Sequence, residues 1–410
     1  MKARVESKAR LMKKTVCTVL AASMLMLASP AEHHSSAAAA SFKDVPSSHW
    51  AKTAIDQAVS KGYFKGYADG TFKPGASVTR AEFAVLLDRV STNEPDGASA
   101  SFSDVSGNWS ESGVKSASAK GFITSADYPN GFKPSTPITR KEMAKWMSSG
   151  LAAESEDYKQ ALSDTADTVV PVAEYFKKTM SKSDFPYVSV AIGTGLMGGY
   201  ADGTFGPAKT TTRAEAAVIL MRLADVQAQK ADSFTGLKEL REVGTTGTNM
   251  KTITPFNSGV TSFKNVQGKK MNYRYNAGSA SVQNVIFIDA RDWSNKKSIY
   301  APIFIGADDR ISNENNTIRA FVNQTVYPTE NFTLSTFKSS FVDQLVAGST
   351  IPNELPKTIG YNTLPTKNPN EQFRTFMNKP EGMQIWTTVF ISYSKPNILY
   401  KVADGSYFSF

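Results

Sequence analysis

Cysteine and histidine are almost absent from this sequence of 410 residues. Cys17 is the single cysteine, and the three histidines are His33, His34 and His49. Residues 231–410 contain neither residue type. This excludes Ser-His-Asp and Cys-His catalysis and the usual zinc sites from that half of the chain. An exported protein without disulfides has to be stable through its hydrophobic cores, which fits a bacterial cell surface.

Long apolar runs are also missing after residue 40. Six basic residues precede an apolar run from Thr15 to Ala28, which is too short to span a membrane comfortably. With the small residues that follow it, this run is typical of a secretory signal peptide, so we expect residues 1–40 to be removed, with cleavage after Ala31 or between Ala37 and Ala40. Met12 is an alternative start of the same peptide, and no small-residue box precedes Cys17, so we expect no lipid anchor.

Charge of one sign does not dominate the rest of the chain. Residues 1–40 contribute six basic and two acidic side chains to the net charge of +9, which leaves +5 for the remainder. Residues 41–230 hold 21 basic and 21 acidic side chains, and residues 231–410 hold 19 and 14. A nucleic-acid binder would show a basic face, so we expect no nucleic-acid partner. An anion bound by residues 41–230 must be held by individually placed side chains.

A four-residue phrase occurs three times, each time ahead of an apolar run. Thr followed three residues later by Glu is the capping box that begins a helix, so two of the four residues have a structural explanation. The Arg between them is needed by neither function, and it stands at the positive end of a helix, where an anion is favoured. The copies are Thr79-Arg80-Ala81-Glu82, Thr139-Arg140-Lys141-Glu142 and Thr212-Arg213-Ala214-Glu215.

Each phrase opens the last helix of a repeat. The three repeats are residues 41–95, 100–155 and 160–224, and we call them repeats one, two and three. Repeats one and two share Asp-Val and a Trp, and we match Asp44, Asp104 and Asp164 to one another. Gly-Tyr-Ala-Asp-Gly-Thr-Phe occurs from Gly66 in repeat one and from Gly199 in repeat three, and repeat two lacks it. Repeat three carries about thirteen extra residues, and its position equivalent to the Trp is Ser183, with Tyr175 or Phe176 as possible replacements.

The repeated Asp-Val, Trp, Gly-Tyr-x-Asp-Gly-Thr-Phe-x-Pro and Thr-Arg-Ala-Glu motifs resemble those of S-layer homology domains. The resemblance covers residues 41 to about 224. It implies an all-α unit in which three helix-loop-helix repeats pack as a pseudo-three-fold trimer, with grooves that bind secondary cell-wall polysaccharide, commonly through a pyruvylated sugar. The residues that match the ligand contacts of the family are Arg80, Arg140, Arg213, Trp50, Trp109, Gly66, Gly70, Gly199 and Gly203.

The chemistry of these residue types fits that ligand, but each type also has a structural interpretation. An Arg can grip a carboxylate with two parallel hydrogen bonds, or it can pair with an acidic side chain of a neighbouring repeat. A Trp can stack on a sugar or pack in the core. The matched Asp residues can cap a helix or turn, or they can contact the ligand. Because repeat two lacks the glycine loop, we rank Arg80 and Arg213 above Arg140.

The carboxyl-terminal half has a different pattern. Residues 225–250 are polar and predict a linker, and residues 251–410 predict an α+β domain. The expected strands are Val282–Asp289, Ser298–Ile305, Thr317–Val326, Gln384–Tyr393 and Ile398–Phe408, and the expected helices are Leu334–Val346 and Glu371–Met377. The fold class is therefore a multidomain chain with an all-α repeat region followed by a strand-rich α+β domain.

We expect a surface protein that is not an enzyme and needs no cofactor or metal. Its predicted role is non-covalent attachment to wall polysaccharide with display of the carboxyl-terminal domain. The only close acidic pairs of that domain, Asp289 with Asp292 and Asp308 with Asp309, stand at strand ends and lack the spacing of a calcium loop. Two alternatives remain: an anchored carbohydrate-active hydrolase, whose acidic pair need not be close in sequence, and a small S-layer lattice protein.

Overall fold

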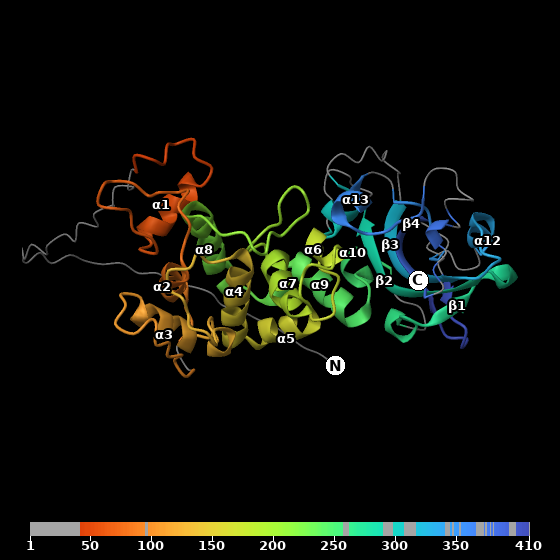
Figure 1. The fold of residues 1–410 in the computed structure, drawn as a ribbon, viewed down its shortest axis with the longest axis horizontal. Helices are drawn as coiled ribbons and strands as arrows, with labels where there is room; N and C mark the ends of the chain where they lie inside the picture. Colours follow the sequence, from red (N-terminus) through yellow and green to blue (C-terminus); the bar gives the residue numbers. More distant parts are fainter. Residues whose placement is uncertain are drawn as a thin grey trace, which may run out of the picture. The chain divides into compact units, whose positions relative to one another are not determined.

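A computed structural model describes most of the chain after residue 41. The described residues are 42–94, 97–256, 262–289, 298–306, 317–340, 345–346, 348–351, 354–365, 373, 375–377, 379, 381–392 and 399–409. They belong to one compact unit, Ala39–Phe410. Its first part is helical and its last part contains the sheets (Figure 1). The expected signal peptide lies outside the described residues.

Each repeat contains two main helices joined by a long loop. These are α1 (Lys52–Ser60) and α2 (Arg80–Val90) in repeat one, α3 (Glu111–Ala119) and α4 (Arg140–Glu154) in repeat two, and α7 (Phe185–Gly193) and α8 (Arg213–Gln227) in repeat three. Two further helices, α5 (Glu156–Asp164) and α6 (Ala173–Phe176), and two single 3-10 turns, Ser125–Asp127 and Lys182–Asp184, lie between them.

The capping boxes form as predicted and fix where the second helix of each repeat begins. Thr79 accepts a hydrogen bond from the backbone of Glu82, whose carboxylate accepts one from the Thr79 N–H at 2.8 Å. The same reciprocal pair begins α4 and α8. Behind each cap, apolar residues at helical spacing enter one continuous core, which includes Phe83, Met147 and Leu220. A local sequence signal therefore sets the helix start, and its apolar face sets the orientation.

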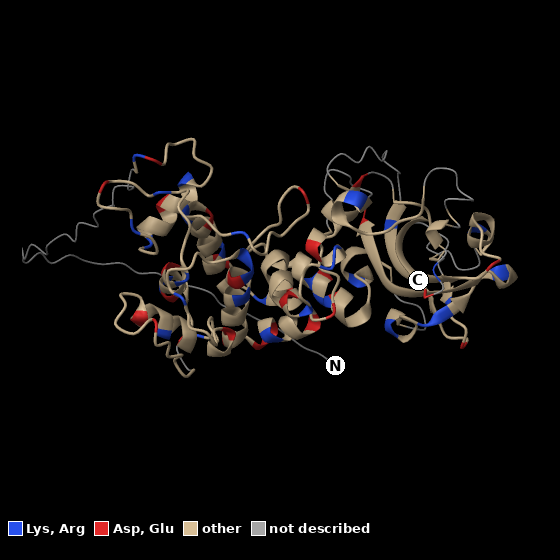
Figure 2. Cartoon of the chain, viewed as in Figure 1, with Lys and Arg blue, Asp and Glu red and all other residues tan. Residues whose placement is uncertain are grey.

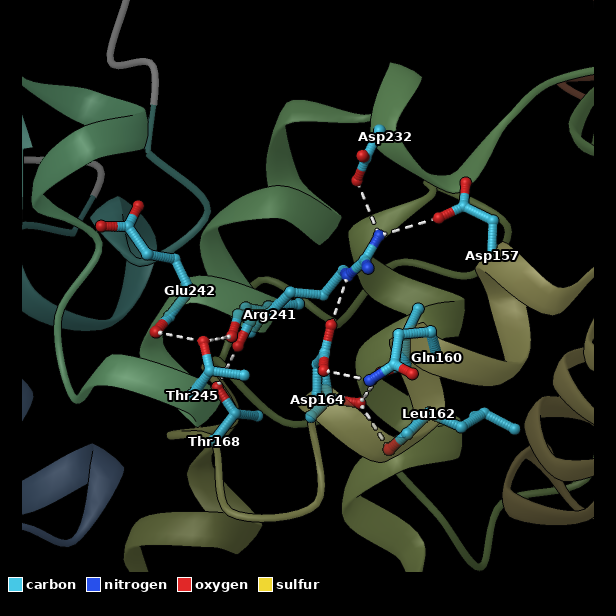
Figure 3. Close-up of polar contacts among 12 residues, drawn as sticks. Asp157, Gln160, Leu162, Asp164, Thr168, Asp232, Arg241, Glu242 and Thr245 are labelled. Carbon is cyan, nitrogen blue, oxygen red and sulfur yellow. Dashed lines mark hydrogen bonds and ion pairs between the residues drawn. The ribbon is translucent and has the colours of Figure 1, made fainter. Parts of the chain in front are cut away.

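Residues 225–250, which we expected to be a linker, are mostly helical. They contain the end of α8, a 3-10 turn at Ala231–Ser233, the helix α9 (Thr235–Thr246) and the start of α10 (Met250–Ile253). Leu237, Leu240 and Val243 are buried on one face of α9. On another side, Arg241 joins three carboxylates, those of Asp157 at 3.1 Å, Asp164 at 2.9 Å and Asp232 at 2.6 Å (Figure 3). The polar composition of this stretch thus reflects an ion-pair cluster and not an extended connection.

The carboxyl-terminal region contains an antiparallel four-stranded sheet in the order β1-β2-β3-β4. Its strands are β1 (Lys270–Asn272), β2 (Gly278–Asp289), β3 (Thr317–Pro328) and β4 (Met383–Ser392), and a separate hairpin joins β5 (Leu399–Lys401) to β6 (Tyr407–Ser409). Short helices α11 (Ala301–Phe304), α12 (Leu334–Ser339) and α13 (Leu355–Ile359) and 3-10 turns at Phe263–Asn265 and Arg274–Asn276 complete the described region.

Three of the expected strands are present and two differ. Residues 298–305, expected as a strand, form a turn and α11, because Pro302 lacks a ladder N–H and favours the first turn of a helix. Residues 398–408 form a hairpin and not one strand, since Asp404-Gly405 makes a turn with Gly405 at φ 88°. The helix expected to reach Val346 ends at Ser339. Residues 373 and 375–377 of the second expected helix are helical, and Tyr393 lies outside the described residues.

The helical and strand regions meet through a hydrophobic cluster of their own. From the repeats it contains Phe176 of α6, and from the following helix α9 it contains Leu240. From the carboxyl-terminal region it contains Ile286 of β2, Trp386 of β4, and Tyr300, which precedes α11. Within the described part of the chain, no helix has the length and apolar character to cross a membrane. Figure 2 shows Lys and Arg interspersed with Asp and Glu along the helices, as the balanced charge count predicts.

Candidate functional site

The loop after each first helix contacts the capped helix of another repeat. The N–H of Arg80 donates to Thr136 O at 2.9 Å, that of Arg140 to Lys209 O at 2.9 Å, and that of Arg213 to Ala76 O at 2.8 Å. Repeat one therefore contacts the loop of repeat two, repeat two that of repeat three, and repeat three that of repeat one. The first helices follow the same cycle, because α2 packs on α3, α4 on α7 and α8 on α1.

The guanidinium groups of Arg140 and Arg213 complete these contacts. Arg213 donates from Nε to Phe72 O at 2.8 Å and from a terminal nitrogen to Lys65 O at 3.0 Å. Arg140 donates in the same way to the carbonyl oxygens of Phe205 and Gly198 in the loop of repeat three. Both arginines are buried, with 8% of the surface of Arg213 and 6% of that of Arg140 exposed. Each one therefore holds its own helix to the loop of the next repeat.

Arg80 reaches the altered loop of repeat two and finds a different partner. It donates to Phe132 O at 2.9 Å, but its Nε bonds Glu142 Oε1 at 2.8 Å, and a terminal nitrogen lies 2.7 Å from the same oxygen. The ring of Tyr128 lies 5.0 Å from its guanidinium carbon. The ion pair with a neighbouring repeat, which the sequence left open for all three arginines, is thus formed by Arg80.

These contacts remove the basis of our ranking of the arginines. We assumed that each Arg lies beside the glycine loop of its own repeat, and this is wrong. Arg213 lies beside the loop of repeat one, which contains Gly66 and Gly70, and Arg140 lies beside that of repeat three, which contains Gly199. Arg80 is the arginine whose neighbouring loop lacks the glycine phrase. The order of the contacts around the cycle could not be read from one repeat alone.

An acidic side chain fastens each loop from the opposite side. Asp44 accepts hydrogen bonds from the N–H groups of Phe72 and Lys73 at 2.8 and 2.7 Å. Asp104 accepts the equivalent pair in repeat two. Desolvation alone would raise the pKa of Asp44, but the two backbone hydrogen bonds lower it below its usual value. These carboxylates therefore act as loop caps, the structural interpretation that the sequence left open.

In repeat three this function belongs to Glu174, so our match of Asp164 to Asp44 is wrong. Glu174 accepts hydrogen bonds from the N–H groups of Phe205 and Gly206 at 2.9 and 2.8 Å. Asp164 pairs instead with Arg241. Because of the extra residues of repeat three, the capping carboxylate stands ten positions further along the chain than Asp164. Its side chain is also one methylene longer than that of Asp. A match by fixed spacing could not predict this.

Sequence reasoning overlooked two lysines in these loops. Lys73 and Lys133 have φ angles of 56° and 54°, in the left-handed region, and Gly206 occupies the third equivalent position at 68°. This conformation is unfavourable for a side chain other than that of glycine, Asn or Asp, and such strain is concentrated at functional sites. The Phe-Lys-Pro phrase in repeats one and two was the signal that could have identified these lysines.

A groove with a volume of about 710 Å³ lies where α2 meets the loop of repeat two. Its basic lining residues are Arg80, Lys133, Lys141 and Lys145. Three carboxylates offset them: Glu142 pairs with Arg80, Asp184 with Lys141 at 3.8 Å and Asp127 with Lys145 at 2.6 Å. Lys133 forms no ion pair within the described residues, so it is the cation left available to an anionic ligand.

The tryptophans of repeats one and two are exposed, which excludes the core-packing interpretation. Trp50 and Trp109 are 67% and 68% exposed, and each stands two residues before the first helix of its repeat. Ser183 stands at the same distance before α7, so repeat three has no Trp there. Tyr175 and Phe176, the possible replacements, contact Phe185 and the carboxyl-terminal region instead.

The glycines that we selected lie in the loops, and one of them contacts the carboxyl-terminal region. Gly66 packs against Phe42, and Gly70 lies beside Lys43. Gly199 lies next to the carbonyl of Thr204. Gly203, at φ 80°, meets a residue of the carboxyl-terminal region, because a Cβ built on it would lie 2.5 Å from Ile359 of α13. Helix α13 of the carboxyl-terminal region therefore contacts the loop of repeat three.

Comparison with known proteins identifies the repeats. The sequence-family model of the S-layer homology domain matches residues 41–84, 101–144 and 178–217. The chain carries three tandem S-layer homology repeats. The third match begins at residue 178, after both Asp164 and Glu174. Within the described residues, no cluster of His, Cys, Asp and Glu is suited to hold a metal ion.

Several known proteins are similar to part of this chain. A cellulosome-anchoring protein of Acetivibrio thermocellus is 37% identical over 107 residues, 25% of this chain and 24% of that protein. The S-layer protein sap of Bacillus anthracis is 30% identical over 183 residues, 44% of this chain and 21% of that protein. An amylopullulanase of Thermoanaerobacterium thermosulfurigenes is 30% identical over 185 residues, 45% of this chain and 9% of that protein. The chain thus spans a quarter or less of the length of each.

Proposed function

We propose that the three S-layer homology repeats hold this protein to the bacterial cell surface by binding secondary cell-wall polysaccharide, with a pyruvylated sugar as the recognised unit. The observation that carries the proposal is the exposure of Trp50 and Trp109 at matching positions. A large aromatic ring in solvent has no role in the core, and its flat apolar face suits the C–H face of a sugar ring. The relatives with anchoring and S-layer names support a surface location.

The repeats pack, in this proposal, as a pseudo-three-fold trimer within one chain. The cycle of backbone contacts from repeat one to two, two to three and three to one supports it. Each interface brings together one capped helix, one loop and a carboxylate that fastens the loop. A groove at each interface follows from this arrangement, and the loop of repeat three is the one that the carboxyl-terminal region contacts.

Within a groove, the arginines position the loop and the lysines meet the anion. Arg140 and Arg213 are buried and already donate to two carbonyl groups each, so little of either guanidinium group is open to a ligand. Lys133 has no ion-pair partner within the described residues, and Lys73 lies over the ring of Tyr67 at 4.0 Å. A single carboxylate, such as that of a pyruvate ketal, would gain a charge-assisted hydrogen bond from either ammonium group.

The carboxyl-terminal region is displayed without catalysis of its own, in our proposal. Residues 231–410 contain no His or Cys, and of the two acidic pairs that we considered only Asp289 lies within the described residues. An amylopullulanase among the relatives shows that such repeats also accompany an enzyme. The similar segment covers 45% of this chain and only 9% of that protein, so we do not carry its activity over to the present chain.

Binding of the purified full chain to isolated cell walls tests the proposal. We expect Trp50→Ala with Trp109→Ala to weaken binding strongly while thermal stability changes little, because both rings are in solvent. Lys73→Gly with Lys133→Gly should also weaken binding, and it relieves the left-handed strain instead of adding to it. The matched control is Tyr275→Ala, which removes a ring that is 69% exposed in the carboxyl-terminal region.

Two results would contradict the proposal. The first is binding that the Trp and Lys variants leave unchanged. The second concerns the sugar: walls from which mild acid has removed pyruvate ketals should retain less protein, and equal retention would reject pyruvate as the recognised group. Arg80→Ala and Arg213→Ala are poorer tests, because these arginines also join the repeats and their loss would disturb the fold.

A further inference from the structure

A second cavity, with a volume of about 560 Å³, lies where α6 meets the carboxyl-terminal sheet. It is within the size range of small-molecule sites, roughly 300–1,000 Å³. Helices α6 and α13 lie side by side at its edge (Figure 1). Phe176, Tyr361 and Trp386 form its floor and are almost fully buried. Tyr175 and Phe185, whose ring centroids are 5.1 Å apart, are only half-buried and add accessible aromatic surface.

Amide side chains line the wall beside these rings. Gln384 donates from Nε2 to Asn323 Oδ1 at 2.9 Å, and Asn323, which is only 4% exposed, donates to Asn284 at 3.1 Å. This chain of amides fixes the orientation of Gln384. Its Oε1, the Oδ1 of Asn362 and the indole N–H of Trp386 have no hydrogen-bond partner among the described residues. The cavity therefore combines fixed acceptors and a donor with an aromatic surface.

The rim of the cavity is basic. Lys178, Lys182 and Lys379 line it with one acid, Glu381. Lys182 pairs with Asp167, whereas Lys178 and Lys379 form no ion pair within the described part of the chain. Lys178 also has φ 58°, in the left-handed region. Packing between the two regions explains the buried rings, but it does not explain why exposed amide groups are held in fixed orientations beside them or why an exposed lysine at the rim has a strained backbone.

We propose that this cavity binds a saccharide that carries an anionic group. Aromatic surface takes the apolar face of a sugar ring, the amides exchange hydrogen bonds with its hydroxyl groups, and Lys178 and Lys379 meet the carboxylate or phosphate. The site is separate from the grooves between repeats, and the argument for it does not depend on the function proposed for them. It would give the displayed region a carbohydrate contact of its own.

The test is calorimetric titration of the full chain with two disaccharides. One consists of glucuronate and N-acetylglucosamine, and the other is chitobiose, which is neutral. We expect the acidic disaccharide to bind about tenfold more tightly, a difference of about 1.4 kcal/mol. Gln384→Ala should weaken both, and Lys178→Gly with Lys379→Ala should remove the preference for the acidic one. Because Lys178→Gly relieves backbone strain, loss of folding would not explain its effect.

Lys264→Ala, which removes an exposed lysine elsewhere in the same region, is the charge control and should bind like the unchanged chain. The proposal is overturned if neither disaccharide binds, or if both bind equally. It is also overturned if binding survives the Lys178, Lys379 and Gln384 changes but is lost in Trp50→Ala with Trp109→Ala. That last result would place the saccharide in the repeat grooves and would leave the function proposed for them intact.

Discussion

Replacing Glu239 by Gln should change how the stability of this protein depends on pH. Glu239 lies on α9, fully buried, where Oε2 accepts hydrogen bonds from Ser298 at 2.7 Å and Asn249 at 3.0 Å. Its Oε1 accepts one from the N–H of Ile299 at 3.1 Å. Burial raises the pKa of Glu239 to about 7 from an ordinary 4.5, although these three hydrogen bonds act in the opposite direction.

The sign and size of the effect follow from linkage. Since the folded-state pKa is the higher one, the stabilisation is complete below the unfolded-state pKa and is lost as the pH rises through about 7. The protein should lose about 2.5 kcal/mol between pH 5 and pH 8 from this residue, out of about 3 kcal/mol in total. Glu239→Gln, which resembles the protonated acid, should not show this loss, so the variant should be the more stable protein at pH 8.

Urea denaturation of the full chain at half-unit steps from pH 5 to pH 8 measures this difference. Glu354→Gln is the control, because Glu354 is 79% exposed and pairs only with Lys357 on the surface. The reasoning is refuted if the free energy of unfolding depends on pH in the same way in the Glu239→Gln variant and in the unchanged protein. Such a result would mean that the three donors hold Glu239 ionised in the folded protein throughout.

Three further predictions concern the repeats. Arg213→Ala should lower the free energy of unfolding by about 1–3 kcal/mol, because two loop carbonyl groups lose their donor, and urea denaturation that shows no change would contradict this. Gly203→Ala should destabilise more than Gly62→Ala, which has the same left-handed backbone but no neighbour within 4 Å, and the difference between the two melting temperatures reports the contact with Ile359. Asp44→Asn should lower the free energy of unfolding at neutral pH. The values for the variant and the unchanged protein should converge as the pH falls through the lowered pKa of Asp44. A difference that stays constant with pH would show that the charge of Asp44 is unimportant.

The sequence predicted what short-range chemistry determines. The three capping boxes gave the first residues of α2, α4 and α8, because both halves of the box lie within four positions. Strands β2, β3 and β4 were predicted in the same way, from runs of β-branched and aromatic residues. The helix α11 was missed because its apolar composition also suits a strand, and only Pro302 distinguishes the two.

What the sequence could not predict depends on contacts between repeats. The choice of loop that each Arg meets is set by the order of packing, so Arg213 contacts repeat one, far away along the chain. The loop cap of repeat three lies in an insertion, where spacing no longer guides the match. Glu239 gave no local signal either, because its burial results from the packing of α9 against residues some 60 positions later.

The insertion in repeat three explains why this repeat differs from the other two. Its short helix α6 provides Glu174, which fastens the loop of repeat three, and the N–H of Ala173 at the start of α6 donates to Gly203 O at 2.8 Å. Two residues after Glu174, Phe176 packs against Trp386 of the sheet. Helix α6 thus both closes the loop of the third repeat and packs against the carboxyl-terminal region.

This arrangement implies that the attachment and the display that we propose depend on one shared helix. A variant that loosens the contact of Phe176 with Trp386 would free α6, and with it the carboxylate that holds the loop of repeat three. Repeats one and two do not depend on α6, since Asp44 and Asp104 fasten their loops. We therefore expect Phe176→Ala to weaken the junction while leaving wall binding through repeats one and two intact. Limited proteolysis between α6 and α7, measured beside wall binding, distinguishes this from a general loss of folding, in which binding would be lost as well.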